Sequence, residues 1–186
     1  LGPVGAPAPL PHRFPPRADL IGRGLLPREG LLVMGGAPKL GKSLALDVKH
    51  PQAKQILARL LAKADVFVQN LAPGAVERLG LGAAELRARH PRLVWCGISG
   101  YGPSGPYAGK RAYDLLVQCE AGLLSVTGTP DAPAKAGIPV ADIASGMYAM
   151  SSILAALLRR EREGVGATLD ITMFESLGEW MGFPAY

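Results

Sequence analysis

The chain has 186 residues, of which 48% are hydrophobic and 19% charged, and its formal net charge is +5. This balance excludes a largely disordered protein, and the length suffices for one domain with a buried core. The positive excess is compatible with an anionic partner, but no basic run alternates with aromatic residues as in proteins that bind single-stranded nucleic acid. We therefore expect solvated arginines at helix ends and no nucleic-acid partner.

The cysteines and the hydropathy of the chain bear on metal binding and on membrane association. Cys96 and Cys119 lie in apolar runs without metal-ligand spacing, which predicts buried, reduced thiols and no metal site. No segment approaches the roughly 20 apolar residues that span a bilayer, and the proline-rich start does not resemble a signal peptide. We therefore expect a cytoplasmic protein without a membrane partner. Because the chain runs from Leu1 to Tyr186 and ends within sequence that still has the pattern of a folded protein, we expect a fragment.

The N-terminal part combines a proline-rich segment with a glycine-rich loop. Residues 1–17 contain six prolines, which predicts an extended tail or linker. The apolar run 31–34 leads into GGAPKLGKS, which satisfies the phosphate-binding pattern GxxxxGK[ST] through Gly36, Gly41, Lys42 and Ser43. In such a loop the backbone amides hold phosphates, the lysine reaches the outer phosphates and the serine binds magnesium. Residues 18–43 thus resemble the start of a RecA-like or AAA-type ATPase core.

The sequence after Ser43 does not continue as this kind of loop requires. A working loop needs a sustained helix and a later strand that ends in an acidic magnesium partner. Here Pro51 follows too soon, and the strands near Val66 and Leu93 have no such partner. ATP and magnesium therefore remain an alternative interpretation. We expect residues 1–43 to be foreign to the rest of the chain, with residues 44–186 as a second unit.

From residue 44 onward, short apolar runs alternate with helical patterns. Strands are predicted at 44–48, 66–68 and 93–98, and helices from Pro51 and over 83–89. The last of these strands is apolar nearly throughout, as expected for a parallel strand that is covered on both faces. The alternation predicts an α/β fold with a partial Rossmann-like parallel sheet and flanking helices, and ligands gather at the carboxyl ends of such strands.

The second half of the chain is predicted to be mainly helical. A glycine- and proline-rich loop over 100–109 precedes a helix over 113–124, and a long helix follows Asp142. The pattern predicts that this long helix buries Met147, Met150, Ile153, Leu154 and Leu157. Gly164 supplies its end, a strand follows over 167–172, and a final helical segment covers 174–181.

Asp142 has two physical interpretations. As an N-cap its carboxylate would accept hydrogen bonds from orphan amides near Ala144 or Ser145. As a catalytic group it would be an anionic nucleophile that the helix N-terminus keeps ionised. The residues alone favour the cap, although the two roles are compatible.

Several blocks together resemble family III CoA-transferases, the formyl-CoA transferase and carnitine CoA-transferase group. They include VQNLAPGAVERLGLG, RAYDLLVQ, GLLSVTGTP, IPVADIASGM and REREGVGATLDITMFESL, in matching order over residues 43–186. The resemblance implies that Asp142 is the nucleophile, and that CoA passes from an acyl-CoA donor to a carboxylic acid through an aspartyl intermediate. Tyr113 favours the transferase branch, because the racemase branch is expected to carry a histidine base there.

The resemblance also implies the CoA contacts. Asn70, Leu71, Arg78, Arg111 and Tyr113 match positions that line the path of the cofactor, and an arginine suits phosphate because its fork donates two hydrogen bonds. Alternatively, Arg78 is a surface helix residue and Tyr113 a half-buried aromatic. Ala72 and Ser99 stand where members of the family carry arginine and, in some, lysine, so fewer phosphate contacts are expected.

The resemblance further implies an incomplete family III fold that forms an interlocked homodimer in the full-length protein. The blocks are similar to members that use short dicarboxylic acyl-CoAs. Two alternatives stay open: a nucleotide-binding ATPase module, and an inactive fragment or chimera.

Overall fold

The computed structural model describes residues 31–34 and 51–185, and the side chains of residues 54–184. The proline-rich segment 1–17, the predicted strand 44–48 and the phosphate-loop residues Gly36, Gly41, Lys42 and Ser43 lie outside the described residues. The alternative that rests on this loop therefore stays a prediction.

A parallel sheet forms the centre of the molecule. Strands β1 (Leu31–Met34), β2 (Val66–Gln69), β3 (Val94–Ser99) and β6 (Thr168–Thr172) lie in the order β1-β2-β3-β6, and every neighbouring pair is parallel. The predicted α/β fold is confirmed. All four strands end at the same edge of the sheet, which is where the sequence predicts a ligand site.

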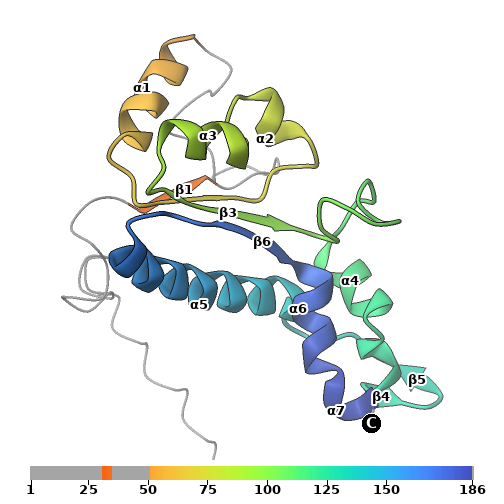
Figure 1. The fold of residues 1–186 in the computed structure, drawn as a ribbon. Helices are drawn as coiled ribbons and strands as arrows, with labels where there is room; N and C mark the ends of the chain where they lie inside the picture. Colours follow the sequence, from red (N-terminus) through yellow and green to blue (C-terminus); the bar gives the residue numbers. More distant parts are fainter. Residues whose placement is uncertain (1–30, 35–50, 186) are drawn as a thin grey trace, which may run out of the picture.

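Helices cover both faces of this sheet (Figure 1). Helices α1 (Pro51–Leu61), α2 (Ala75–Arg78) and α3 (Ala83–Arg89) lie on one face, whereas α5 (Val140–Glu163) lies on the other. Alternation along the strands explains the division, because successive side chains point to opposite faces. Phe67 and Trp95 pack with α1–α3, and their neighbours Val66 and Val94 pack with Ala156 and Leu157 of α5.

A smaller helical layer extends from the carboxyl edge of the sheet. It comprises α4 (Asp114–Glu120), the 3-10 turn η2 (Leu123–Ser125), the hairpin of β4 (Gly128–Thr129) and β5 (Ala132–Pro133), α6 (Met173–Trp180) and α7 (Gly182–Ala185). Val117, Ala141, Met173 and Leu177 form its core. The predicted helix over 113–124 is thus divided, because Gly122 adopts a left-handed conformation with φ 83°.

The long helix differs from its prediction in two respects. It begins at Val140 after Pro139, so Asp142 lies in the first turn and the prediction that it is the N-cap is wrong. Met147 and Met150 are 61% and 63% exposed, although the pattern predicts them to be buried. The buried side carries mostly small side chains, among them Ala141, Ala144, Ser145, Ala149 and Ala156, because these let the helix approach its neighbours closely.

The C-terminal end of α5 is fixed by a buried ion pair. Arg160, whose side chain is 5% exposed, donates to Asp65 at 2.8 Å and to the Arg92 carbonyl oxygen at 3.3 Å. These contacts join α5 to the turns that precede β2 and β3. The predicted end at Gly164 is confirmed, since this glycine has φ 77° and its amide donates to the Arg160 carbonyl oxygen.

Both cysteines are free thiols, as predicted, but only one is buried. Cys96 lies within β3, where burial raises the pKa of its thiol to about 11. Cys119 on α4 is exposed, contrary to the prediction, because Val117 and Gln118 form the buried side of that helix.

Candidate active site

A cavity of about 330 Å³ opens at the carboxyl ends of β2 and β3. The turn after β2 contributes Leu71, Ala72 and Gly74, and the end of β3 contributes Ser99. Gln69, which is 7% exposed, accepts a hydrogen bond from the Leu71 amide at 2.8 Å and thereby shapes this turn. The two departures from the family pattern, Ala72 and Ser99, both line the cavity, so its wall has no cation at either position.

Of the five residues that the resemblance implies for CoA, Leu71 alone lines this cavity. Asn70 precedes it in the same turn and is exposed. Arg78 is also exposed, and its Nη1 atom lies 3.0 Å from the point that a Cβ on Gly74 would occupy. These three residues therefore form one group around the turn after β2.

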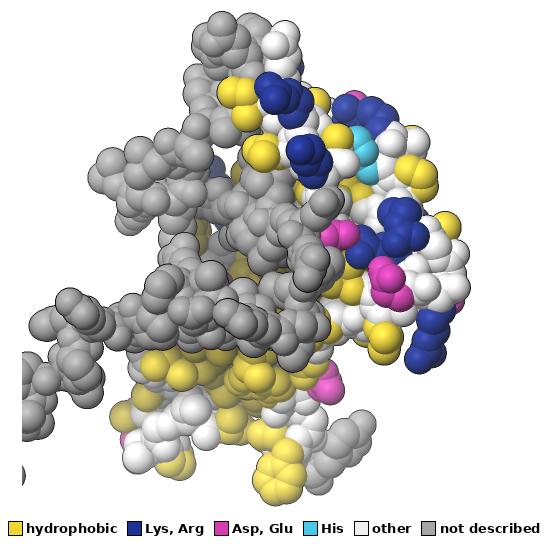
Figure 2. Space-filling model, turned by 90° about the vertical axis from the view of Figure 1, so that its left-hand side faces the viewer, with side chains coloured by type: hydrophobic (Ala, Val, Ile, Leu, Met, Phe, Trp, Pro, Cys, Tyr) yellow, Lys and Arg dark blue, Asp and Glu magenta, His cyan; other side chains and the backbone are white. Residues whose placement is uncertain are grey.

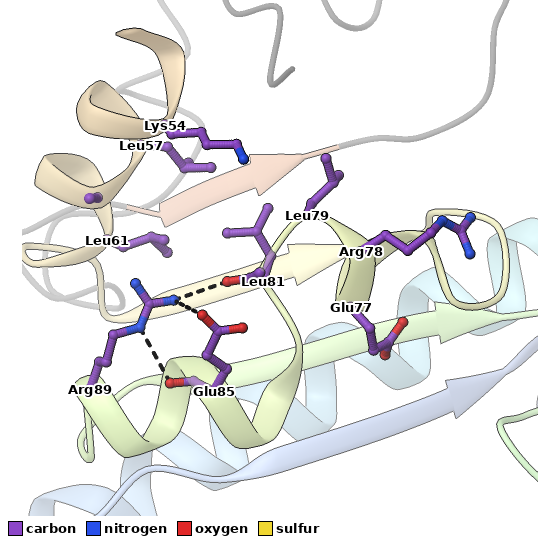
Figure 3. A pocket seen from close by; sticks show the side chains of 11 residues that line it. Lys54, Leu57, Leu61, Glu77, Arg78, Leu79, Leu81, Glu85 and Arg89 are labelled. Atoms are coloured by element: carbon purple, nitrogen blue, oxygen red, sulfur yellow. Dashed lines mark hydrogen bonds and ion pairs between the residues drawn. The ribbon is translucent and has the colours of Figure 1, made fainter. Parts of the chain in front are cut away.

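Arg78 also lies at the edge of a second cavity, of about 410 Å³, between α1, α2 and α3 (Figure 3). Its side chain points away from Leu57 and Leu61, which line the apolar part of this cavity. Arg89 donates to the Glu85 carboxylate at 3.1 Å and to the Gly80 carbonyl oxygen at 2.9 Å. In the second cavity the carboxylate of Glu85 is therefore paired with the guanidinium group of Arg89.

Asp142 lies in the first turn of α5, where this helix meets the smaller helical layer, and a residue of α4 holds its backbone in place. Asp114 Oδ1 accepts hydrogen bonds from the amides of Ala141, at 2.8 Å, and Asp142, at 3.2 Å. Gln118, which is 1% exposed, donates to the other oxygen of Asp114 and accepts from the Ala136 amide. Asp114 therefore caps α5 from another helix, while the side chain of Asp142 is exposed.

This role of Asp114 was not predicted from the sequence. Its local signal, an acidic residue in the first turn of its own helix, is common, and the partner amides lie far along the chain. Tyr113 immediately precedes Asp114 and is 66% exposed. The structure thus brings Tyr113 and Asp142 to the same end of the α4–α5 pair.

The loop after β3 connects the two groups. A Cβ on Gly100 would lie 2.0 Å from the Cβ of Ala112, so the chain just before Tyr113 packs directly against the end of β3. Arg111, which is exposed, precedes this contact. The Phe174 amide also donates to the Gly100 carbonyl oxygen at 3.0 Å. Arg111 and Tyr113 are therefore anchored beside the strand whose Ser99 lines the cavity.

An aromatic and ionic cluster fixes the same loop. Tyr101 packs between Tyr107 and Phe174, with ring centroids 5.3 and 6.0 Å apart, and Lys110 lies 4.3 Å from the ring centroid of Tyr107. Lys110 is ion-paired with Glu120 of α4. This hydrogen bond raises the pKa of Lys110 and lowers that of Glu120, and burial raises the pKa of Tyr101. A loop over 100–109 was predicted from the sequence, but this cluster was not.

The model of CoA-transferase family III matches residues 39–186. The chain belongs to this family. It is 40% identical over 136 residues to an acyl-CoA transferase of Fusarium pseudograminearum, covering 73% of this chain and 30% of that protein. It is 39% identical over 135 residues to a succinate–glutarate CoA-transferase of Agrobacterium fabrum, covering 72% and 34%.

Solved structures agree with this assignment. A CaiB/BaiF family protein from Brucella suis superposes with a TM-score of 0.72 at 35% identity, covering 75% of this chain and 37% of that one. Rv3272 from Mycobacterium tuberculosis gives 0.71 at 36% identity, covering 77% and 41%. The predicted family and fold are confirmed. The chain spans about a third of the length of these relatives.

The family match begins at Lys39, inside the phosphate-loop pattern, and the proposed boundary near residue 43 stays a prediction. The names of the family and of these two relatives refer to the transfer of CoA or acyl groups, and they include neither ATP nor magnesium. Among residues 31–34 and 51–185, no three His, Cys, Asp or Glu side chains lie together as a metal site would require.

Proposed function

We propose that this chain carries the nucleophile and part of the CoA site of a CoA-transferase, which moves CoA from an acyl-CoA donor to a carboxylic acid. One observation carries the proposal. In a member of this family, Asp114 fixes the backbone of Asp142 at a helix N-terminus while the Asp142 side chain remains exposed. A nucleophile requires this combination of a defined position and access to substrate.

The cavity after β2 and β3 is proposed to hold part of CoA. Leu71 supplies apolar surface at its rim, and Asn70 and Arg78 flank the same turn. Arg111 and Tyr113 would contact the cofactor between this cavity and Asp142, since both are exposed and anchored beside the end of β3. Because Ala72 and Ser99 carry no charge, Arg78 and Arg111 are the proposed phosphate partners.

The chemistry follows from an ionised Asp142. Its carboxylate attacks the carbonyl carbon of the donor thioester, the C–S bond breaks, and an aspartyl-acyl anhydride forms with release of CoA thiolate. The thiolate then attacks the aspartyl carbonyl, which gives an aspartyl-CoA thioester and frees the donor acid. The acceptor carboxylate repeats these steps in reverse and leaves with CoA. Each step exchanges one activated acyl group for another, and the positive end of α5 favours the anionic form of Asp142.

Short dicarboxylic acids are the proposed acyl groups. Relatives at 39% and 38% identity are named succinate–glutarate and acetyl-CoA:oxalate CoA-transferases. We also propose a cytoplasmic location and a homodimer. The family resemblance supports both, and neither depends on which acids are used.

The test is to incubate the purified chain with succinyl-CoA and glutarate and to measure glutaryl-CoA by mass spectrometry. A covalent CoA adduct on the peptide that contains Asp142 is expected in the absence of acceptor. Asp131→Asn is the matched control, because Asp131 is an exposed acid in the β4–β5 turn. Undiminished transfer by Asp142→Asn would refute the nucleophile assignment.

A nucleotide-binding module is the second candidate. It is favoured by β1, a strand that pairs with the sheet directly before the phosphate-loop pattern, as such loops require. ATP hydrolysis that Lys42→Ala abolishes would support it, and absence of ATP binding would exclude it.

A further inference from the structure

Gln118 is a buried polar residue in an otherwise apolar part of the molecule. Its side chain, on α4, is 1% exposed and belongs to the smaller helical layer, whose core is formed by Val117, Ala141, Met173 and Leu177. Figure 2 shows that hydrophobic side chains also gather on the surface of the lower part of the molecule, where α5, α6 and α7 lie in Figure 1. A buried side-chain amide destabilises a fold unless its donor and its acceptor both find partners, so the partners of Gln118 show what it does.

The two ends of the Gln118 amide meet partners of opposite kinds. Its nitrogen donates to Asp114 Oδ2, one turn earlier on α4, and its oxygen accepts from the Ala136 amide at 3.0 Å. An ionised carboxylate only accepts hydrogen bonds and a backbone N–H only donates them, so a side chain that bridges the two must donate and accept at once. Glutamine meets this requirement, whereas an ionised glutamate has no donor and a lysine or an arginine has no acceptor.

The bridge leaves the other oxygen of Asp114 for helix α5. Asp114 Oδ1 accepts from the amides of Ala141, at 2.8 Å, and Asp142, at 3.2 Å. The carboxylate of an aspartate otherwise turns over a broad range about its last side-chain bond. Because Gln118 holds Oδ2 and is itself buried, such a turn would break a hydrogen bond that water cannot replace. Gln118 therefore fixes the direction in which Asp114 presents its oxygen to α5.

The segment that leads into α5 is held at both ends by α4. Gln118 binds the amide of Ala136, and Asp114 binds the amide of Ala141. Residues 137–139, which lie between these two anchors, are exposed. Exposed residues restrain a chain weakly, so the two anchors determine where the first turn of α5 begins.

We propose that Gln118 is a positioning residue for Asp142, which acts through Asp114 and through the segment before α5. The inference rests on the proposed function, in which Asp142 is the nucleophile, and it names the residue that keeps the Asp142 backbone in place. A displacement of a reacting group by about 1 Å can lower a rate by about a hundredfold. Loss of the bridge should therefore lower kcat and leave the KM for acyl-CoA nearly unchanged, because Gln118 does not line the cavity after β2 and β3.

Gln118→Met separates hydrogen bonding from packing, because methionine fills a similar volume without either hydrogen bond. With succinyl-CoA and glutarate, kcat is expected to fall about ten- to a hundredfold, and the KM for succinyl-CoA to change less than about threefold. Circular dichroism verifies that the variant is folded. A kcat equal to that of wild type would show that Gln118 only fills space, and would overturn the proposal.

Gln118→Glu makes the bridge dependent on pH. When protonated, the new carboxyl group can donate to Asp114 and accept from Ala136, as glutamine does; when ionised, it has no donor and repels Asp114. Burial and the neighbouring Asp114 both raise the pKa of the new carboxyl group above its usual value of about 4.3. The kcat of this variant relative to wild type is therefore expected to recover at least about fivefold as the pH falls from about 8 to about 5.5.

Gln55→Glu is the matched control for this pH dependence, because it makes the same change at an exposed residue of α1. Its kcat relative to wild type should not change over the same pH range. A Gln118→Glu variant whose relative kcat stays constant or falls as the pH is lowered would refute the role of the bridge.

Amide hydrogen exchange, followed by NMR, tests the network without any transfer of CoA. In Gln118→Met the amides of Ala141 and Asp142 are expected to exchange at least about tenfold faster than in wild type. The Val94 amide, which donates to the Asp65 carbonyl oxygen, is the internal reference and should be unchanged. Unchanged exchange at Ala141 and Asp142 would contradict the inference. Faster exchange there, in a protein whose wild type transfers no CoA, would support the positioning network and contradict the proposed function.

Discussion

The two ends of helix α5 use a charged residue in opposite ways. Near the N-terminus, Asp142 has an exposed carboxylate while Asp114 holds its backbone amide. Near the C-terminus, Arg160 is buried, and it pairs with Asp65 and with a backbone carbonyl. A buried charge that is paired with its neighbours stabilises the fold, whereas an exposed carboxylate on a fixed backbone can contact a substrate. Four predictions test this contrast.

The largest expected effect is on activity, from Asp142→Asn. Removal of a nucleophile is expected to lower the transfer rate by roughly 10⁴-fold or more. The free energy of unfolding should fall by less than about 1 kcal/mol, because the side chain is exposed and its interaction with the helix dipole is of this size. Steady-state kinetics and urea denaturation of the same preparations measure both. A large loss of stability would show that Asp142 is structural, like Arg160.

Arg160→Ala is expected to have the largest effect on stability. It leaves the half-buried Asp65 without its partner, so the free energy of unfolding should fall by about 3 kcal/mol. Urea denaturation followed by circular dichroism measures it. The matched control is Arg159→Ala, which breaks an exposed pair with Glu163 and should cost at most about 1 kcal/mol. Equal effects of the two substitutions would contradict the distinction between a buried and an exposed charge on α5.

Asp114→Ala should lower both the transfer activity and the free energy of unfolding, each to an intermediate degree. Two amides at the start of α5 lose their acceptor, which is expected to cost about 1–2 kcal/mol of stability. Transfer should also fall, because the backbone that carries Asp142 is no longer fixed. Asp114→Asn keeps one acceptor oxygen and should recover part of both losses. If Asp114→Ala lowered stability but left kcat and KM unchanged, the cap would have no role in positioning Asp142.

The smallest effect is expected at the Lys110–Glu120 pair, which is exposed. The ion pair lowers the pKa of Glu120, so its contribution to stability is present above the usual carboxyl pKa and is lost as the pH falls through the lowered value. Glu120→Gln should therefore melt slightly below wild type at neutral pH, and the difference should shrink in acid. Thermal melting as a function of pH measures it, and a difference that grows in acid would contradict this account.

Several elements of the fold were predicted from local signals in the sequence. Pro51 begins α1, residues 83–89 form α3, and Gly164 ends α5, as predicted. Pro51 and Gly164 have backbone preferences that act within one turn. The strands β2, β3 and β6 were also predicted to within one or two residues. β2 and β3 are largely buried and their sequences are apolar nearly throughout, whereas β6 alternates between more and less exposed side chains.

The errors involve residues whose environment depends on distant parts of the chain. Helix α5 is oriented so that Met147 and Met150 are exposed to solvent. It packs against its neighbours mainly through small side chains and not through its largest ones. The capping role of Asp114 and the pairing of Arg160 with Asp65 join segments far apart in sequence. Hydrophobic periodicity defines a helix face but not which of two apolar faces will meet the sheet.

By itself the sequence determined the family, the parallel α/β sheet and the order of its elements, because these depend on local backbone preferences and on blocks of matching residues. Only the tertiary structure decided that Asp142 lies inside the first turn, held by Asp114, and that the other face of α5 remains open. The physical reason is that capping and burial depend on which groups meet in space, and such contacts leave no fixed spacing in the chain.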